Sequence, residues 1–134
     1  MFSNSHALPV QDLKVVKEQL RHAIIQAEKF SRKPEVNANN WADWFSDAIA
    51  LLDSINPKIP FHPDMLPDKG FSLGVRQIIA SATQAYVFGG VGSWNDLVFE
   101  KPEIQEEYEK VTSKLYETVK YALVMASNSF TLDD

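Results

Sequence analysis

The chain contains no cysteine, which excludes disulfide bonds, thiolate metal sites and cysteine nucleophiles together. No stretch approaches the roughly 20 consecutive apolar residues that a membrane-crossing helix needs. The opening residues, MFSNSHALP, lack the basic start and the apolar stretch of a secretory signal peptide. These absences predict a soluble, cytoplasmic protein.

Basic residues are scarcer than acidic ones, since 13 Lys and Arg stand against 18 Asp and Glu and give a net charge of −5. An acidic surface repels nucleic acids and anionic membranes, so neither is expected as a partner, and it attracts basic proteins. With 134 residues and a hydrophobic fraction of 45%, the chain can bury a core of its own. We expect a single domain over residues 1–134, with frayed ends at 1–8 and 128–134.

Strand patterns are also lacking, and four segments instead carry apolar residues at intervals of three and four positions, as amphipathic helices do. These segments are residues 9–31, 41–55, 71–87 and 103–127. Four prolines predict a long irregular connection over residues 56–70, between the second and third helices. The expected fold is an all-α, single-domain bundle of four main helices.

Helix ends and faces follow from the same pattern. Asn39 and Asn40 are expected to cap the second helix, whose inner face would include Ile55. The third helix carries a single charged residue and is expected to be the most buried, with Tyr86 on its inner side. A short helical turn is expected over residues 94–99, before the last helix.

Three of the five glycines lie within residues 89–92, between the third and fourth expected helices. Their spacing matches neither the P-loop nor the dinucleotide-binding pattern, so a sharp Gly-rich turn is favoured over a phosphate cradle. In that interpretation Gly89 ends the third helix and Trp94 plugs the end of the bundle. Asn95 or Asp96 would cap the turn that follows.

Catalytic and metal-binding patterns are absent from the sequence. The Glu-x-x-His pair typical of metal sites in helical bundles does not occur, and the histidines are scattered at positions 6, 22 and 62. Ser93 lacks the Gly-x-Ser-x-Gly surroundings of a nucleophile elbow. No catalytic residue, cofactor or metal site is predicted.

Residues 88–97, FGGVGSWNDL, resemble a Phe-Gly-Gly-x-Gly-Ser-aromatic-Asn-Asp-apolar signature of small, uncharacterised bacterial helical proteins. In that family the signature lies between the last two long helices, so the resemblance implies an all-helical fold, and it implies no chemistry. By type, small acidic chains of this kind are similar to the immunity proteins of bacterial competition systems. Such proteins bind a co-encoded toxin domain and block it.

The leading hypothesis is therefore a non-enzymatic immunity protein that neutralises a cognate, basic, nuclease-type toxin domain by stoichiometric occlusion. Acidic side chains would steer the complex together, and apolar groups near the glycine segment or the proline-rich connection would anchor it. The candidate contacts, chosen by charge and helical phase, are Asp43, Asp47, Asp64, Asp68, Trp94, Asp96, Glu103, Glu106 and Glu107.

Two other functions stay open. The segment from Gly89 to Asp96 could bind an anion or a small molecule in an enzyme, with Asn95 and Asp96 as its polar groups. The chain could also be a structural or oligomeric helical module, and its oligomeric state is not predicted. Trp41 and its neighbours on the second helix could anchor a partner, although their helical spacing favours the core.

Overall fold

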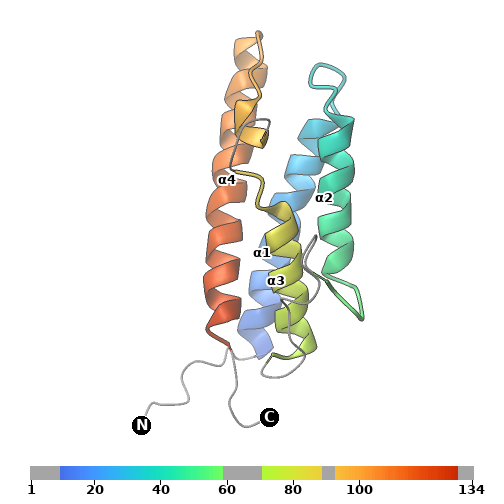
Figure 1. Cartoon of the computed structure of the whole chain (residues 1–134). Coiled ribbons are helices and arrows are strands. Elements are labelled where there is room, and N and C mark those ends of the chain that lie inside the picture. The colour runs from blue at the N-terminus through green and yellow to red at the C-terminus, as the bar shows by residue number, and fades with distance from the viewer. Residues whose placement is uncertain (1–9, 59–70, 89–92, 130–134) are drawn as a thin grey trace.

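The computed structural model describes residues 10–58, 71–88 and 93–129, which form four α-helices and one short 3-10 helix (Figure 1). The elements are α1 (Val10–Ser31), α2 (Asn39–Leu51), α3 (Leu73–Ala85), η2 (Trp94–Asp96) and α4 (Pro102–Ser127). Successive α-helices run in opposite directions, and α1 and α3 each pack against both α2 and α4. No strand occurs among these residues. The predicted all-α bundle of four main helices is confirmed. None of the described helices is both long and apolar enough to cross a membrane.

The third helix is as long as α2 and much shorter than α1 and α4. It has 13 residues, against 22 in α1 and 26 in α4. At 1.5 Å per residue, α3 is about 20 Å long and α4 about 39 Å long. One side of the bundle is therefore left open near the start of α4, and η2 lies there, beyond the end of α3 (Figure 1).

Trp94 fills this open side, as its predicted role of plugging the bundle requires. Its side chain is fully buried, and its ring centroid lies 5.2 Å from that of Phe45 and 5.6 Å from that of Tyr108. The rings of Trp41 and Phe30 complete the cluster at 5.7 Å and 6.2 Å. Four helical positions from α1, α2 and α4 thus surround one indole, and aromatic contacts replace the missing turns of α3.

Hydrogen bonds fix Trp94 in this position. Its indole Nε1–H donates to Oγ1 of Thr112 at 2.8 Å, and the Tyr108 hydroxyl donates to its carbonyl oxygen at 2.7 Å. Its backbone N–H donates to the carbonyl oxygen of Val87 at 3.1 Å. Since Val87 precedes residues 89–92 and Trp94 follows them, this last bond joins the two described sides of the glycine segment.

As predicted, α3 has a larger buried share than the other α-helices. Three of its buried residues are polar: Gln77, Ser81 and Gln84, which share one side of the helix because they are four and three positions apart. They donate to backbone carbonyl oxygens, Ser81 Oγ to that of Ala48 at 2.7 Å and Gln84 Nε2 to that of Trp44 at 3.2 Å. Nε2 of Gln77 donates in the same way, at 2.8 Å, to the carbonyl just beyond α2 at position 54.

The second helix begins and ends differently from the prediction. Ala38 occupies its N-cap without a side-chain hydrogen bond, and Asn39 and Asn40 lie inside the helix, so they are not its caps. The helix ends at Leu51, after which the backbone tightens into hydrogen bonds spanning three residues. This tightening takes Ile55 off the inner face, and Ile55 is 87% exposed.

The third helix also ends earlier than predicted, at Ala85, so Gly89 does not terminate it. Tyr86 follows in an extended conformation and is 46% exposed, although the helical period placed it inside. Because the helix has already ended, its period no longer determines which way Tyr86 faces.

The short turn after the glycines is shorter than predicted, since η2 covers only residues 94–96. Ser93 occupies its N-cap in an extended conformation, and no side chain caps it. Asn95 and Asp96 lie within the turn and do not cap it. The burial of Trp94, and not a side-chain cap, holds residues 94–96 in place.

Candidate partner-binding surfaces

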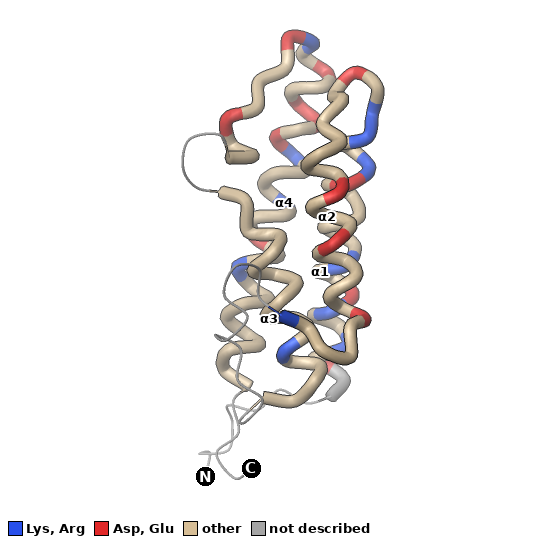
Figure 2. The backbone as a smooth tube through the Cα atoms, turned by 45° about the vertical axis from the view of Figure 1, so that its right-hand side comes forward, with Lys and Arg blue, Asp and Glu red and all other residues tan. Residues whose placement is uncertain are grey.

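Charge is divided unevenly along the bundle (Figure 2). The end of α1 with the turn that follows it, α2 as far as Asp47, and the chain from η2 into the first turns of α4 together form what we call the acidic end. Its acidic side chains are Glu28, Glu35, Asp43, Asp47, Asp96, Glu100, Glu103, Glu106, Glu107 and Glu109, with Lys29, Arg32, Lys33, Lys101 and Lys110 as bases. At the other end, the basic end, Lys14, Lys17, Arg21, Lys58, Arg76, Lys114 and Lys120 outnumber Asp12, Glu18, Asp53 and Glu117.

The acidic end contains a hollow of about 330 Å³. Its lining residues are Glu35, Val98, Phe99, Glu100, Lys101 and Ile104. Val98 is 82% exposed, and Phe99 is half-buried. The hollow therefore combines apolar side chains with two carboxylates and one ammonium group.

Phe99 is held firmly in this hollow. Its ring makes edge contacts with Phe30 and Tyr108, at centroid distances of 5.6 Å and 5.3 Å. Its backbone N–H donates to Oε1 of Gln105 at 2.9 Å. The aromatic cluster around Trp94 thus continues outward through Phe30 and Tyr108 to a residue that reaches the surface.

Three of the predicted contact residues already pair with bases of this chain. Asp43 accepts from Arg32 at 3.1 Å, Glu107 from Lys33 at 2.6 Å, and Glu106 lies 3.5 Å from Lys110. Their charges are partly compensated where they lie. Sequence reasoning could not detect the first two pairs, because Asp43 lies 11 positions from its partner and Glu107 lies 74 from its own.

Asp47 and Glu103, also predicted contacts, are exposed and make no ion pair with any described residue. The same holds for Glu35 and Glu100, which the prediction did not include and which line the hollow. Glu35 and Glu100 lie just outside the predicted ends of helices, and this position in the sequence could have identified them as candidate contacts.

The remaining predicted contacts fall into two groups. Asp96 is exposed on η2, close to the acidic start of α4, whereas Trp94 belongs to the core. A fully buried side chain offers no surface to a partner, so Trp94 is not a contact residue in this fold. Asp64 and Asp68 lie outside the described residues.

The basic end uses several of its charges internally. The Arg21 guanidinium donates two hydrogen bonds of 3.0 Å to the carboxylate of Asp53, joining α1 to the chain after α2. This contact lowers the pKa of Asp53 below its usual range and raises that of Arg21. Nearby, Lys17 donates to Oε1 of the buried Gln77 at 2.6 Å, and burial lowers the pKa of Lys17.

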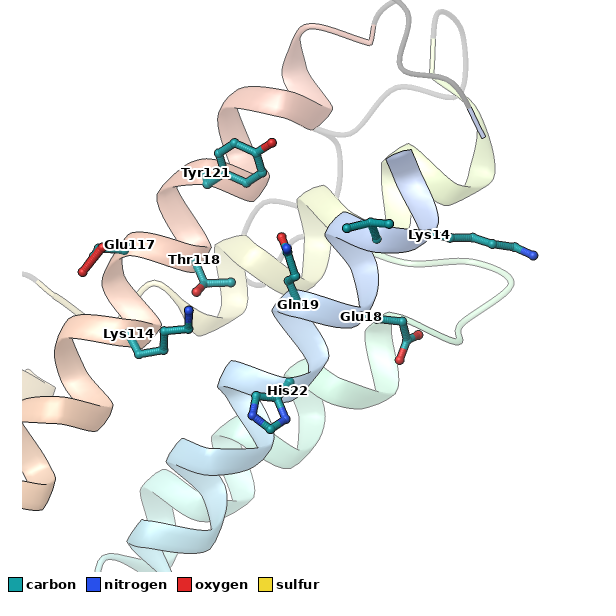
Figure 3. Close-up of a pocket in the computed structure, with 9 residues that line it drawn as sticks. Lys14, Glu18, Gln19, His22, Lys114, Glu117, Thr118 and Tyr121 are labelled. Atoms are coloured by element: carbon teal, nitrogen blue, oxygen red, sulfur yellow. The ribbon is translucent and has the colours of Figure 1, made fainter. Parts of the chain in front are cut away.

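An open groove of about 820 Å³ runs between α1 and α4 (Figure 3). It is lined by Lys14, Val15, Glu18, Gln19, His22, Lys114, Glu117, Thr118 and Tyr121. Val15 and Tyr121 expose about half of their surface, and lysines and glutamates are equally represented. The groove therefore suits neither a strongly cationic nor a strongly anionic ligand, and the sequence analysis did not predict it.

A partly exposed aromatic cluster, which the sequence also did not predict, joins the end of α3 to the middle of α4. The ring of Phe88 lies 5.4 Å from Tyr86 and 5.1 Å from Tyr116, and Nζ of Lys120 lies 4.9 Å from the centre of the Tyr116 ring. Tyr86 joins this cluster because it lies outside the helix that was expected to bury it.

Within the described residues, no group of three or more His, Asp or Glu side chains is arranged to hold a metal ion. Comparisons with protein-family models, with curated proteins and with solved structures find no match to this chain. The resemblance of residues 88–97 to a bacterial helical family stays a prediction.

Proposed function

We propose that this chain is a bacterial immunity-type protein, which neutralises a cognate, basic, nuclease-type toxin domain by stoichiometric occlusion. The observation that carries the proposal is the acidic end, where carboxylates without an ion pair among the described residues border a hollow that also presents apolar side chains. In this proposal the protein acts in the cytoplasm, binds without catalysis and needs no cofactor.

The charge at the acidic end fits a basic partner. A nuclease-type active site or substrate cleft presents cations, because it must bind phosphates. Glu35, Glu100 and Glu103 would face those cations and would speed the encounter of the two proteins. Because these carboxylates make no ion pair with described residues, pairing with a toxin breaks no salt bridge within the described part of the chain.

The apolar part of the hollow would supply the anchor. Protein interfaces concentrate their binding energy in a few central apolar or aromatic side chains, surrounded by polar groups that exclude water. Val98 and Phe99 are placed in this way, with Glu35 and Glu100 beside them. Since Phe99 is already held by Phe30, Tyr108 and Gln105, binding would cost little additional ordering.

The contacts predicted from the sequence rank differently once their ion pairs are known. In the proposal Asp47 and Glu103 are direct contacts, since they are exposed at the acidic end and make no ion pair with a described residue, and the exposed Asp96 stays a candidate contact. Asp43, Glu106 and Glu107 would exchange or share an existing ion pair and contribute less. Asp64 and Asp68 stay candidates from the sequence alone.

The test is a growth assay in a bacterial host. The C-terminal region of the product of the neighbouring upstream reading frame is induced with and without this chain. We expect the region to stop growth when induced alone and the chain to restore growth when co-expressed. An upstream product that is harmless, or that kills regardless of this chain, would contradict the proposal.

A matched pair of variants locates the protective surface in the same assay. Glu100→Lys with Glu103→Lys reverses two charges at the acidic end and should abolish protection. Asp12→Lys with Glu18→Lys reverses two charges at the basic end and should leave protection intact. Each double removes one acidic residue from the first turn of a helix. Glu18→Lys also removes the exposed contact of Glu18 with Arg21 at 3.4 Å, which contributes little to stability, so circular dichroism must show that this double keeps its helices.

The enzyme hypothesis stays a prediction, because residues 89–92 of the proposed loop lie outside the described residues. Nothing in the described part of the chain favours it over binding. Asn95 and Asp96 are exposed on η2, and no pocket named above includes either of them.

A further inference from the structure

The groove between α1 and α4 is built in three levels, because the two helices run in opposite directions (Figure 1). Its inner residues recur every three or four positions on each helix, at 15, 19 and 22 on α1 and at 114, 118 and 121 on α4. Each level therefore takes one residue from each helix. From the middle of the bundle toward the basic end, the three pairs are His22 with Lys114, Gln19 with Thr118, and Val15 with Tyr121.

The polarity of the groove changes from one end to the other. The first level supplies an imidazole and an ammonium group, and the second supplies an amide and a hydroxyl. At the third level, Val15 and Tyr121 expose 54% and 50% of their surface. Val124, one turn further along α4, exposes 56%. The groove is therefore polar at one end and apolar at the other.

The charged side chains that line the groove do not all point into it. Figure 3 shows Lys114 pointing toward α1 and Glu117 pointing away from α1. Lys14 and Glu18 point away from α4 in the same view, and Glu18 lies 3.4 Å from Arg21, which partly compensates its charge. Lys114 makes no ion pair with a described residue, although Glu117 is only three positions away. Among the charged lining residues that the structure describes, the ammonium group of Lys114 thus faces the groove alone.

From this arrangement, we propose that the groove is a binding site for a small amphiphilic monocarboxylate, with its carboxylate at Lys114 and its apolar body over Val15 and Tyr121. The volume of about 820 Å³ lies within the range of roughly 300–1,000 Å³ that small-molecule sites occupy, and such sites form between the helices of bundles. The inference does not depend on the proposed function, since the groove and the hollow of the acidic end share no lining residue.

Each level has a part in this binding. The ammonium group of Lys114 donates a charge-assisted hydrogen bond to the carboxylate, and the Thr118 hydroxyl and Gln19 amide lie one level away as further donors. The apolar body removes the exposed surface of Val15 and Tyr121 from water. Seven residues separate Lys114 from Tyr121, or about 10.5 Å along α4, so the site favours a carboxylate at one end of an extended body.

The experiment is an NMR titration of the full chain, labelled with nitrogen-15, with sodium octanoate below the concentration at which it forms micelles. Near pH 7 the acid is ionised. We expect saturable shifts of backbone amides at the groove-lining positions of α1 and α4. Octylammonium, which has the same body and the opposite charge, should bind at least about tenfold more weakly. From butanoate to octanoate, the affinity should rise by up to about fourfold for each added CH₂ group.

Variants separate the two ends of the site. Lys114→Gln should weaken octanoate binding at least about tenfold and remove its advantage over octylammonium. The matched control, Lys110→Gln, removes the same charge one turn earlier on α4, outside the groove, and should bind octanoate as wild type does. Tyr121→Ser removes apolar surface at the other end and should weaken the binding of octanoate more than that of butanoate.

The amide spectrum of each variant shows whether its fold is kept, and the comparison of octanoate with octylammonium needs no variant. Absence of saturable shifts with octanoate would overturn the proposal. So would shifts centred on another part of the chain, such as the hollow of the acidic end or the aromatic cluster of Tyr86 and Tyr116. Equal affinities for octanoate and octylammonium would contradict the role of Lys114, as would equal effects of Lys114→Gln and Lys110→Gln.

Discussion

The two ends of the bundle are stabilised in different ways. At the acidic end one indole is surrounded by four aromatic rings, because α3 is too short to cover α1, α2 and α4 there. Toward the basic end, polar side chains of α3 donate to backbone carbonyls of α2 and of the residues after it, and Arg21 binds Asp53. Ion pairs join elements at both ends, since Arg32 binds Asp43 and Lys33 binds Glu107 at the acidic end, so the two ends differ in the aromatic cluster and in the polar contacts of α3.

This difference bears on function. Glu100 and Glu103 make no ion pair with the described residues, and the packing of the acidic end rests on Trp94 and its neighbours. The negative charges of Glu100 and Glu103 are therefore available to a partner, and pairing them does not reduce the stability of the fold. At the basic end, Arg21 and Lys17 are held by Asp53 and Gln77, so a partner would have to replace these contacts.

The largest expected effect is the loss of the aromatic plug. Trp94→Ala removes a fully buried indole, and large-to-small substitutions of this kind cost about 3–5 kcal/mol. Urea unfolding followed by circular dichroism measures the change in the free energy of unfolding. As a milder control, Thr112→Val removes the oxygen that accepts from the indole and should cost about 1–3 kcal/mol. Equal stability of wild type and Trp94→Ala would show that the plug does not hold the acidic end together.

A smaller effect is expected at the interface of α2 and α3. Ser81→Ala removes a buried hydroxyl that donates a hydrogen bond to the carbonyl oxygen of Ala48, with 2.7 Å between the two oxygen atoms. Such a hydrogen bond contributes about 0.5–1.5 kcal/mol to stability. The same unfolding experiment measures it. The control is Ser113→Ala, on the exposed side of α4, which should change the free energy of unfolding little. The exposed Ser72 is not used, because its hydroxyl caps the start of α3. A loss in Ser81→Ala no larger than in Ser113→Ala would contradict the role of these polar contacts.

The smallest effect belongs to the exposed ion pair of the basic end. Asp53→Asn should lower the free energy of unfolding by at most about 1 kcal/mol at neutral pH, since the Asp53 carboxylate is largely solvated. Because the pKa of Asp53 is lowered in the folded state, its contribution is present above the ordinary carboxyl pKa and disappears as the pH falls through the lowered value.

Unfolding of wild type and Asp53→Asn between about pH 2 and pH 7 tests this sign. The two stability curves should converge at the acid end of that range and separate toward neutral pH. A constant difference at every pH would mean that the charge of Asp53 contributes nothing to stability.

The bundle itself could be predicted from the sequence because apolar residues recur at helical spacing, and burial follows that period in α1, α3 and α4. The prediction was wrong where a helix stopped early, as at Ile55 and Tyr86, since the period says nothing about residues beyond the helix end. It also missed the inward roles of Gln77 and Ser81, whose acceptors are backbone carbonyls that a sequence does not display.

The candidate contacts were limited by a similar lack of information. Charge and helical phase correctly placed Asp43, Asp47, Glu103 and Glu106 on the surface. They could not show that Asp43 lies beside Arg32, because that pair depends on how α2 turns back along α1. Nor could they bring Glu35 and Phe99 together in one hollow, since 64 positions separate them in the chain.

The measurement that tests the central claim most directly is the affinity of this chain for the toxin domain identified in the growth assay, by titration calorimetry at several salt concentrations. We predict that Glu100→Lys with Glu103→Lys weakens binding at least about tenfold and flattens the dependence of affinity on salt. Asp12→Lys with Glu18→Lys should bind as wild type does. Equal affinities for the wild type and both doubles would contradict the claim that the acidic end is the binding surface.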